Sequence, residues 1–220
     1  MKKIFLLTFI SFIAVFAVAQ DTTTHKKDGY ILHFASNDRN FDPALKKRMI
    51  ETFFKVYPVL AKDFNPKTAK ELYFNIDTAY KGVAATGGGK IVYNPQWFIK
   101  NPGDIDVVTH EVMHVVQNYG RGGGPGWLTE GIADYVRYKY GVDNAGAKWS
   151  LPSLKPEHSY KNSYRITARF LNWLEEHQSK GIVVKLDEAM RNHTYKNEMW
   201  AEITGKSLDE LWQIYISKTD

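Results

Sequence analysis

The order of hydrophobic patterns along this chain predicts an α+β fold built as two lobes. Residues 30–35 and 71–76 alternate apolar and polar side chains, which is typical of half-buried strands. From about Asp104 onward, the apolar residues recur at helical spacing between glycine-rich breaks. No repeat or low-complexity linker divides the 220 residues. We therefore predict a small N-terminal sheet with helices, a mainly helical C-terminal lobe, and a central helix between them.

The first lobe is expected to hold four strands and one long helix. The strands are predicted at residues 30–35, 71–76, 82–86 and 90–93. The helix should begin with Asp42 as its N-cap and Pro43 in its first turn. Pro58 lies within the same apolar stripe and should kink or shorten the helix, because proline lacks the backbone N–H.

The second lobe is expected to be helical throughout. Asp104 should cap a helix that runs to about Tyr119 and stops at Gly120. Further helices are predicted at residues 127–140, 164–178 and 183–192. A last helix should open with a capping box formed by Ser207 and Glu210.

The N-terminus has the features of a secretory signal peptide. Lys2 and Lys3 precede an apolar stretch that ends in Ala17-Val18-Ala19, the small-residue pattern of a cleavage site. We predict a signal peptide over residues 1–19 and a mature domain over residues 20–220, with lobes at about 28–120 and 121–217. An uncleaved anchor is the alternative, but the apolar stretch is short for a membrane span.

Composition excludes several classes of protein. The hydrophobic share of 44% and the charged share of 24% suit a globular domain and exclude a disordered tail or a membrane bundle. With no cysteine, the chain has no disulfide, thiolate metal site, cysteine nucleophile or lipid-bearing cysteine. The net charge of +5 comes without a basic run interleaved with aromatic residues, so nucleic-acid binding is not indicated.

Two histidines on the central helix have the spacing of zinc ligands. His110 and His114 are four positions apart and therefore share one helix face. Two imidazoles placed in this way can bind one zinc ion. Glu111 lies beside the first histidine, where it can act as a general base toward a water molecule activated by the metal.

The residues that follow supply the rest of a zinc site. Glu130 comes sixteen positions after His114, on a second helix reached through a glycine-rich turn, and is the predicted third ligand. Asp134 lies one helical turn later and could accept the free ring N–H of a ligand histidine. Core histidines on a valine-rich helix would be the alternative, but buried imidazoles without partners are costly.

The motif His110-Glu111-Val112-Met113-His114, followed by Glu130-Gly131-Ile132-Ala133-Asp134, resembles the gluzincin metallopeptidases. More specifically, the chain resembles the basic secretory protein family of plants and bacteria over residues 30 to 217. The matching stretches are residues 110–117, 127–137, 164–171 and 204–212.

This resemblance implies a zincin-like fold and one zinc ion per chain, held by two histidines and a glutamate. It also implies a residue that stabilises the oxyanion of the tetrahedral intermediate. Tyr164 is the first candidate for this role, and Tyr160 and His158 are the alternatives. A half-buried core tyrosine remains the other interpretation of Tyr164.

In zincins, the strand before the active-site helix pairs with the extended substrate backbone. We therefore expect the substrate-binding strand to be formed by Lys90, Ile91, Val92, Tyr93 and Asn94. The three glycines before Lys90 do not form a phosphate-binding loop, because no serine or threonine follows the lysine. They are expected to form a turn beside that strand.

The combined expectation is a secreted or periplasmic zinc metallopeptidase that acts on peptides or proteins. Two alternatives stay open: a zinc amidase acting on cell-wall or glycoprotein substrates, and an inactive zincin used as a binding module. No nucleic-acid partner is expected, and no stable membrane anchor after signal cleavage. Oligomeric state, side-chain preference and endo- or exopeptidase action are not determined by the sequence.

Overall fold

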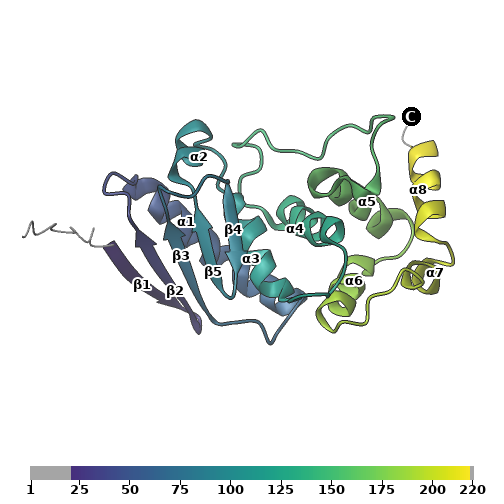
Figure 1. Ribbon diagram of the computed structural model, residues 1–220, viewed down its shortest axis with the longest axis horizontal. Coiled ribbons are helices and arrows are strands. Elements are labelled where there is room, and N and C mark those ends of the chain that lie inside the picture. The colour runs from purple at the N-terminus through teal and green to yellow at the C-terminus, as the bar shows by residue number, and fades with distance from the viewer. Residues whose placement is uncertain (1–20, 219–220) are drawn as a thin grey trace, which may run out of the picture.

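The computed structural model describes residues 21–218, and the predicted signal peptide lies outside them. A five-stranded sheet occupies one side of the molecule and a group of helices the other, with α3 between them (Figure 1). This is the α+β arrangement predicted from the order of the hydrophobic patterns.

The sheet has the strand order β1-β2-β3-β5-β4. The strands are β1 (Asp21–Lys27), β2 (Tyr30–Ser36), β3 (Glu71–Ile76), β4 (Ala84–Gly87) and β5 (Lys90–Tyr93). β2, β3 and β5 run parallel to one another in the middle of the sheet, while β1 and β4 close its two edges as antiparallel strands. The sequence did not predict β1, whose residues are polar and lack an apolar alternation.

Helix α1 (Pro43–Asp63) packs against the inner face of the sheet. Its N-cap is Asp42, whose Oδ1 accepts a hydrogen bond from the Ala44 N–H at 2.8 Å. The helix runs for 21 residues with Pro58 inside it. The proline therefore does not shorten the helix, which was one of the two expected effects. The apolar face of α1 meets inward strand residues such as Phe34 and Phe74.

The remaining elements are mostly helical. They are α2 (Pro95–Lys100), α3 (Val107–Gln117), α4 (Gly126–Tyr140), the short 3₁₀ helix η1 (Tyr160–Asn162), α5 (Tyr164–His177), α6 (Ile182–Arg191), α7 (Met199–Thr204) and α8 (Leu208–Ser217). The short helices α2, η1 and α7 were not predicted. The capping box of Ser207 and Glu210 at the start of α8 is present as expected.

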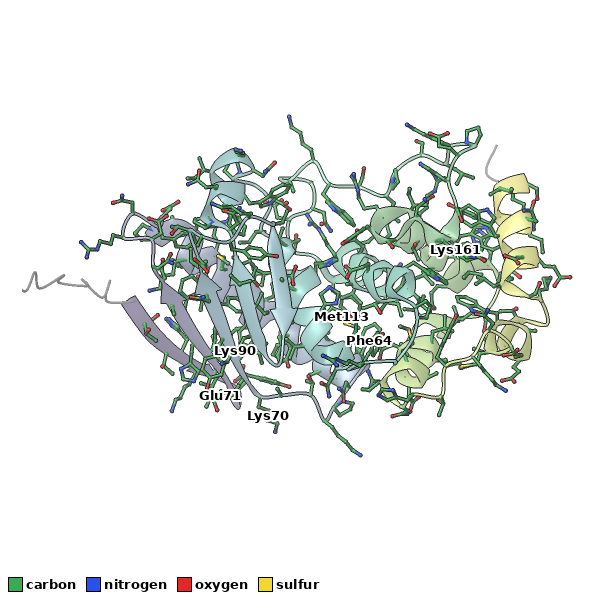
Figure 2. All side chains as sticks on the ribbon, in the orientation of Figure 1. Phe64, Lys70, Glu71, Lys90, Met113 and Lys161 are labelled. Atoms are coloured by element: carbon green, nitrogen blue, oxygen red, sulfur yellow. The ribbon has the colours of Figure 1, made fainter. Side chains whose placement is uncertain are left out.

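Helix α3 is shorter than predicted at both ends. Asp106, not Asp104, precedes its first turn, and Asp104 instead forms an ion pair with Arg137 of α4. The helix ends before Asn118, which adopts the left-handed conformation that stops it two residues before the expected glycine. Met113 of α3 is fully buried, where the sheet side meets the helical side (Figure 2).

Helices α4 and α5 pack at close range. A Cβ atom at Gly131 of α4 would overlap the Thr167 side chain of α5, so only glycine permits this separation. The buried hydrophobic core is continuous from the sheet through α3 and α4 to α8. Within residues 21–218, no helix combines the length and apolar character needed to cross a membrane.

Candidate metal centre

The two histidines of α3 and the glutamate of α4 lie close together. His110 Nε2 and His114 Nε2 lie 3.1 Å apart. Glu130 Oε2 lies 3.3 Å from the first of these nitrogens and 3.5 Å from the second. One ligand atom from each of the three side chains falls within 4.8 Å of the others, so this group could hold a metal ion.

The spacing of these atoms fits a tetrahedral zinc ion. Donors about 2.0–2.1 Å from one tetrahedral centre stand roughly 3.3–3.4 Å from each other. The observed separations of 3.1, 3.3 and 3.5 Å bracket that value. Two imidazole nitrogens and one carboxylate oxygen are also donors that zinc accepts in catalytic sites, where the fourth position stays open.

Each histidine of this candidate group is oriented by a hydrogen bond from its other ring nitrogen. His110 Nδ1 lies 2.7 Å from Asp134 Oδ1. His114 Nδ1 lies 2.6 Å from Gln117 Oε1, and Gln117 Nε2 donates to the Thr129 carbonyl at 2.9 Å. These bonds place the ring proton on Nδ1 and leave Nε2 facing the site. Sequence reasoning missed Gln117, although its position three residues after His114 was a usable signal.

The cluster concentrates charge in a buried place. Burial lowers the pKa of His110, but hydrogen bonds to Asp134 and Glu130 outweigh it and raise the pKa to about 10. Burial of Glu130 acts to raise its pKa, yet the two histidines prevail and hold it well below its usual range. The carboxylates of Asp134 and Glu130 thus favour the protonated form of the His110 imidazole that lies between them.

Glu111 contacts a residue that the sequence did not identify. Thr86 Oγ1, on β4, lies 2.6 Å from Glu111 Oε2 and 3.1 Å from the Glu111 carbonyl oxygen. The hydroxyl has one proton to donate, and the shorter contact is to the carboxylate. Glu111 is buried, with 6% of its surface exposed, so this bond fixes the rotamer of a side chain that has little access to water.

Tyr164 lies at the cleft, and the two alternatives do not. Its ring stacks near that of His110, with centroids 6.2 Å apart and planes at 18°, and the side chain is 54% exposed. Tyr164 is about half-buried, as one alternative from the sequence held, but it does not belong to the hydrophobic core. Tyr160 is buried and donates its hydroxyl to Asp209, and His158 Nδ1 accepts a backbone N–H from Lys155. Neither alternative lines the cleft.

The backbone at Tyr164 is unusual. Ser163 and Tyr164 have φ values of 65° and 49°, in the left-handed region that non-glycine residues rarely adopt. Such conformations cost free energy and are often found at functional sites. The charge of Glu130, partial burial, and the charges of Asp134 and Glu111 raise the pKa of Tyr164, which keeps its hydroxyl protonated.

The expected substrate strand needs correction. Residues Lys90 to Tyr93 form β5, which is paired with β3 on one side and with β4 on the other, so it has no open edge. Tyr93 is fully buried, Ile91 belongs to the core, and Asn94 caps α2. The open edge on this side of the sheet belongs to β4, which precedes the glycine turn.

A cleft of about 1240 Å³ runs along β4 and over the metal-binding group. Its walls come from both sides of the molecule: from β4 and α2, from α3 and α4, and from the start of α5. Residues 146–149 of the segment between α4 and α5 also line it. This segment crosses the top of the view from the α2 side to α5 (Figure 1).

Comparison with solved structures finds zinc metallopeptidases at low identity. The M1 zinc metallopeptidase from Deinococcus radiodurans is 15% identical, with a TM-score of 0.47 over 90% of this chain and 48% of that one. A mutant of it bound to a Tyr-Ser-Ala substrate is 14% identical, with a TM-score of 0.48 over 91% and 48%. The chain thus spans about half the length of these structures. At these scores the likeness assigns no activity to the chain.

A comparison with curated proteins finds no match. A comparison with protein families matches residues 24–215 to the family described as peptidase of plants and bacteria. The match covers nearly all described residues and agrees with the resemblance to the basic secretory proteins. The chain belongs to this family, whose description supports a peptidase role.

Proposed function

We propose that the protein is an exported, zinc-dependent metallopeptidase that hydrolyses peptide bonds in the cleft along β4. The observation that carries the proposal is the group of His110, His114 and Glu130, whose ligand atoms stand at tetrahedral spacing. Family membership supports the peptidase role. One zinc ion per chain accounts for the donor set.

When bound, zinc would polarise the scissile carbonyl and lower the pKa of a water molecule. Glu111 accepts a proton from the attacking water molecule and delivers it to the leaving nitrogen. The Thr86 hydroxyl donates a hydrogen bond to Oε2 of this carboxylate, which leaves Oε1 as the oxygen for proton transfer. Asp134 and Gln117 hold the ligand histidines in place. Tyr164 donates its hydroxyl to the oxyanion of the tetrahedral intermediate.

The substrate backbone pairs with the open edge of β4. The Asn94 N–H donates to the Val83 carbonyl at 3.0 Å, which marks these two residues as a hydrogen-bonded pair. Because such pairs alternate along antiparallel strands, Ala84 and Thr86 direct their backbone groups away from β5. The Ala84 carbonyl is taken by the Tyr80 hydroxyl, so the Thr86 backbone is the main site for pairing.

Export and domain organisation extend the proposal. The Ala17-Val18-Ala19 pattern supports cleavage after Ala19 and a mature domain that begins at Gln20. That domain is one zincin-like unit, since its two lobes share a continuous core. N-terminal sequencing of protein collected outside the expressing cell tests this, and a retained Met1 contradicts it.

The deciding experiment replaces Glu111 with Gln in the zinc-loaded protein. Glutamine keeps the shape and can still bond to Thr86, but it cannot accept the proton. We expect full zinc content and a fall in peptide turnover of at least about 10²-fold. Glu188→Gln on the exposed face of α6 makes the same chemical change outside the cleft and should leave turnover intact.

The outcomes separate the candidate functions. Wild-type turnover in Glu111→Gln contradicts the mechanism, and loss of zinc makes Glu111 a ligand. A wild-type protein that binds zinc but cleaves no peptide leaves two possibilities. Release of amino sugars or amines from cell-wall or glycoprotein substrates indicates the amidase, and no release indicates a binding module.

A further inference from the structure

The acidic side chains that line the cleft are all engaged by other groups. Glu111 is bonded to Thr86, and Asp134 is bonded to His110. Glu130 lies between the two ligand histidines. Asp104 pairs with Arg137 and accepts a hydrogen bond from the Trp97 indole at 2.9 Å. Three of these carboxylates are partnered by Arg137 or by the two histidines, and Glu111 is bonded to a neutral hydroxyl.

Three cationic side chains of the cleft lack such compensation. Lys100, at the end of α2, Lys148, in the segment after α4, and Arg165, in the first turn of α5, all line the cleft and are exposed. Among residues 21–218, no acidic side chain forms an ion pair with any of them. Arg165 makes only a long hydrogen bond of 3.5 Å to the Ser150 carbonyl.

The fold brings these three cations around one opening. A Cβ atom at Gly103, just after α2, would overlap the Gly146 carbonyl, so the segments that carry Lys100 and Lys148 are in contact. Arg165 directly follows Tyr164, whose ring lies beside His110. Lys100 and Lys148 thus stand on the α2 side of the cleft, and the Arg165 guanidinium lies 3.5 Å from the Ser150 carbonyl, two residues after Lys148.

We propose that this cleft selects peptides that carry carboxylates near the scissile bond. The inference rests on the proposed peptidase function and specifies its substrate class. Unpaired charge of one sign in a cleft attracts ligands of the opposite sign and raises their local concentration. A bound zinc ion would add positive charge to the same opening. The carboxylates could be acidic side chains or a free C-terminus, which share this chemistry.

The test compares four fluorogenic peptides of one sequence. Two flank the scissile bond with Glu or with Gln and have amidated C-termini. The other two have the same residues and free C-termini. At low ionic strength we expect kcat/KM to be roughly tenfold higher for the Glu peptides, and the advantage should shrink as salt is added. An advantage confined to free C-termini would identify the terminal carboxylate as the group recognised.

Charge removal should then reduce the preference. Lys148→Gln and Arg165→Gln should each lower the Glu-to-Gln ratio by roughly two- to fivefold, the range for exposed charge pairs. The effect should fall mainly on KM. Lys55→Gln is the matched control, because Lys55 is exposed on α1 outside the cleft and carries the same charge. The ratio should not change in this control.

A binding measurement keeps the two proposals apart. Fluorescence anisotropy of the same peptides on zinc-loaded Glu111→Gln reports cleft preference without turnover. Equal cleavage of all four peptides overturns the acidic preference and leaves the peptidase intact. If none of the peptides is cleaved, the peptidase proposal fails. The anisotropy then shows whether the cleft still prefers peptides that carry carboxylates. Tighter binding of the Glu peptides supports the preference, and equal binding overturns it.

Discussion

Thr86 Oγ1 lies 2.6 Å from Glu111 Oε2, so the edge strand that is proposed to hold substrate also touches the proposed general base. Thr86→Val keeps the branched shape of the side chain but removes the donor. The buried carboxylate then loses a hydrogen bond and the rotamer it fixed. We expect turnover to fall roughly tenfold, equivalent to about 1.4 kcal/mol, with zinc content unchanged. Thr86→Ser retains the hydroxyl and should keep most of the activity. A valine variant that turns over as fast as the serine variant would show that this bond has no role in positioning Glu111.

The support of His114 by Gln117 should be visible in zinc affinity. Gln117→Leu removes the acceptor for the His114 Nδ1 proton and also the bond to the Thr129 carbonyl. Because partners of ligand histidines fix ring orientation, affinity should fall about 10- to 100-fold. Competition with a chromophoric chelator measures this directly. Gln117→Glu keeps an acceptor for the ring and serves as the control. Equal affinities for the leucine variant and the wild type would limit Gln117 to joining α3 and α4.

The zinc-free protein should lose stability at alkaline pH. In the folded chain the pKa of His110 is raised from 6.5 to about 10 by its carboxylate partners. A raised pKa contributes stability that is fully present below the unfolded value and is lost as pH rises through the folded value. The free energy of unfolding of chelated protein should therefore decline between pH 6.5 and about 10. Urea titrations across this range measure it. Zinc-loaded protein should not show this decline, because the metal replaces the proton. Identical pH dependence with and without zinc contradicts the assignment of His110 as a ligand.

Tyr164→Phe tests the oxyanion donor. The hydroxyl is protonated at neutral pH, since nearby negative charge raises its pKa. Its loss should lower kcat by roughly 10²-fold, the usual cost of removing one such donor, with little change in KM. Zinc content should remain full because the tyrosine is not a ligand. Tyr138→Phe is the matched control, because Tyr138 is exposed on α4 and does not line the cleft. A rise in KM with an unchanged kcat would assign Tyr164 to substrate contact.

The close approach of α4 and α5 predicts a sensitive glycine. Gly131→Ala should destabilise the protein by about 1–3 kcal/mol, because the added methyl group overlaps the Thr167 side chain. Thr167→Ser removes the overlapping methyl group and keeps the hydroxyl that bonds to the Tyr160 carbonyl. The double variant should therefore recover part of the loss in thermal unfolding. Strictly additive effects of the two substitutions would mean that the helices do not meet at this point.

Local patterns carried most of the information about the metal centre. The ligand spacing of His110 and His114 follows from one turn of helix, and Glu130 and Asp134 share a face for the same reason. The predicted α+β order also followed from local periodicity. Gln117 was equally local and could have been found from its position on the same helix.

The missing parts depend on contacts between distant segments. The sequence does not show that β4, and not β5, lies at the edge, because strand order is set by packing across the whole sheet. The contact between Thr86 and Glu111 depends on that order. Strand β1 was missed because an exposed edge strand needs no apolar alternation.

An open strand edge also bears on whether copies of this chain associate. Unpaired backbone groups can template pairing with another molecule, which leads to self-association. β4 presents only four residues, and the Tyr80 hydroxyl already binds one of its outward carbonyls. The opposite edge, β1, is longer but carries Lys26 and Lys27, which repel an identical edge. The edge at the cleft thus offers few backbone groups for pairing with a second copy, and we expect a peptide to stay there only when the proposed metal centre binds it as well.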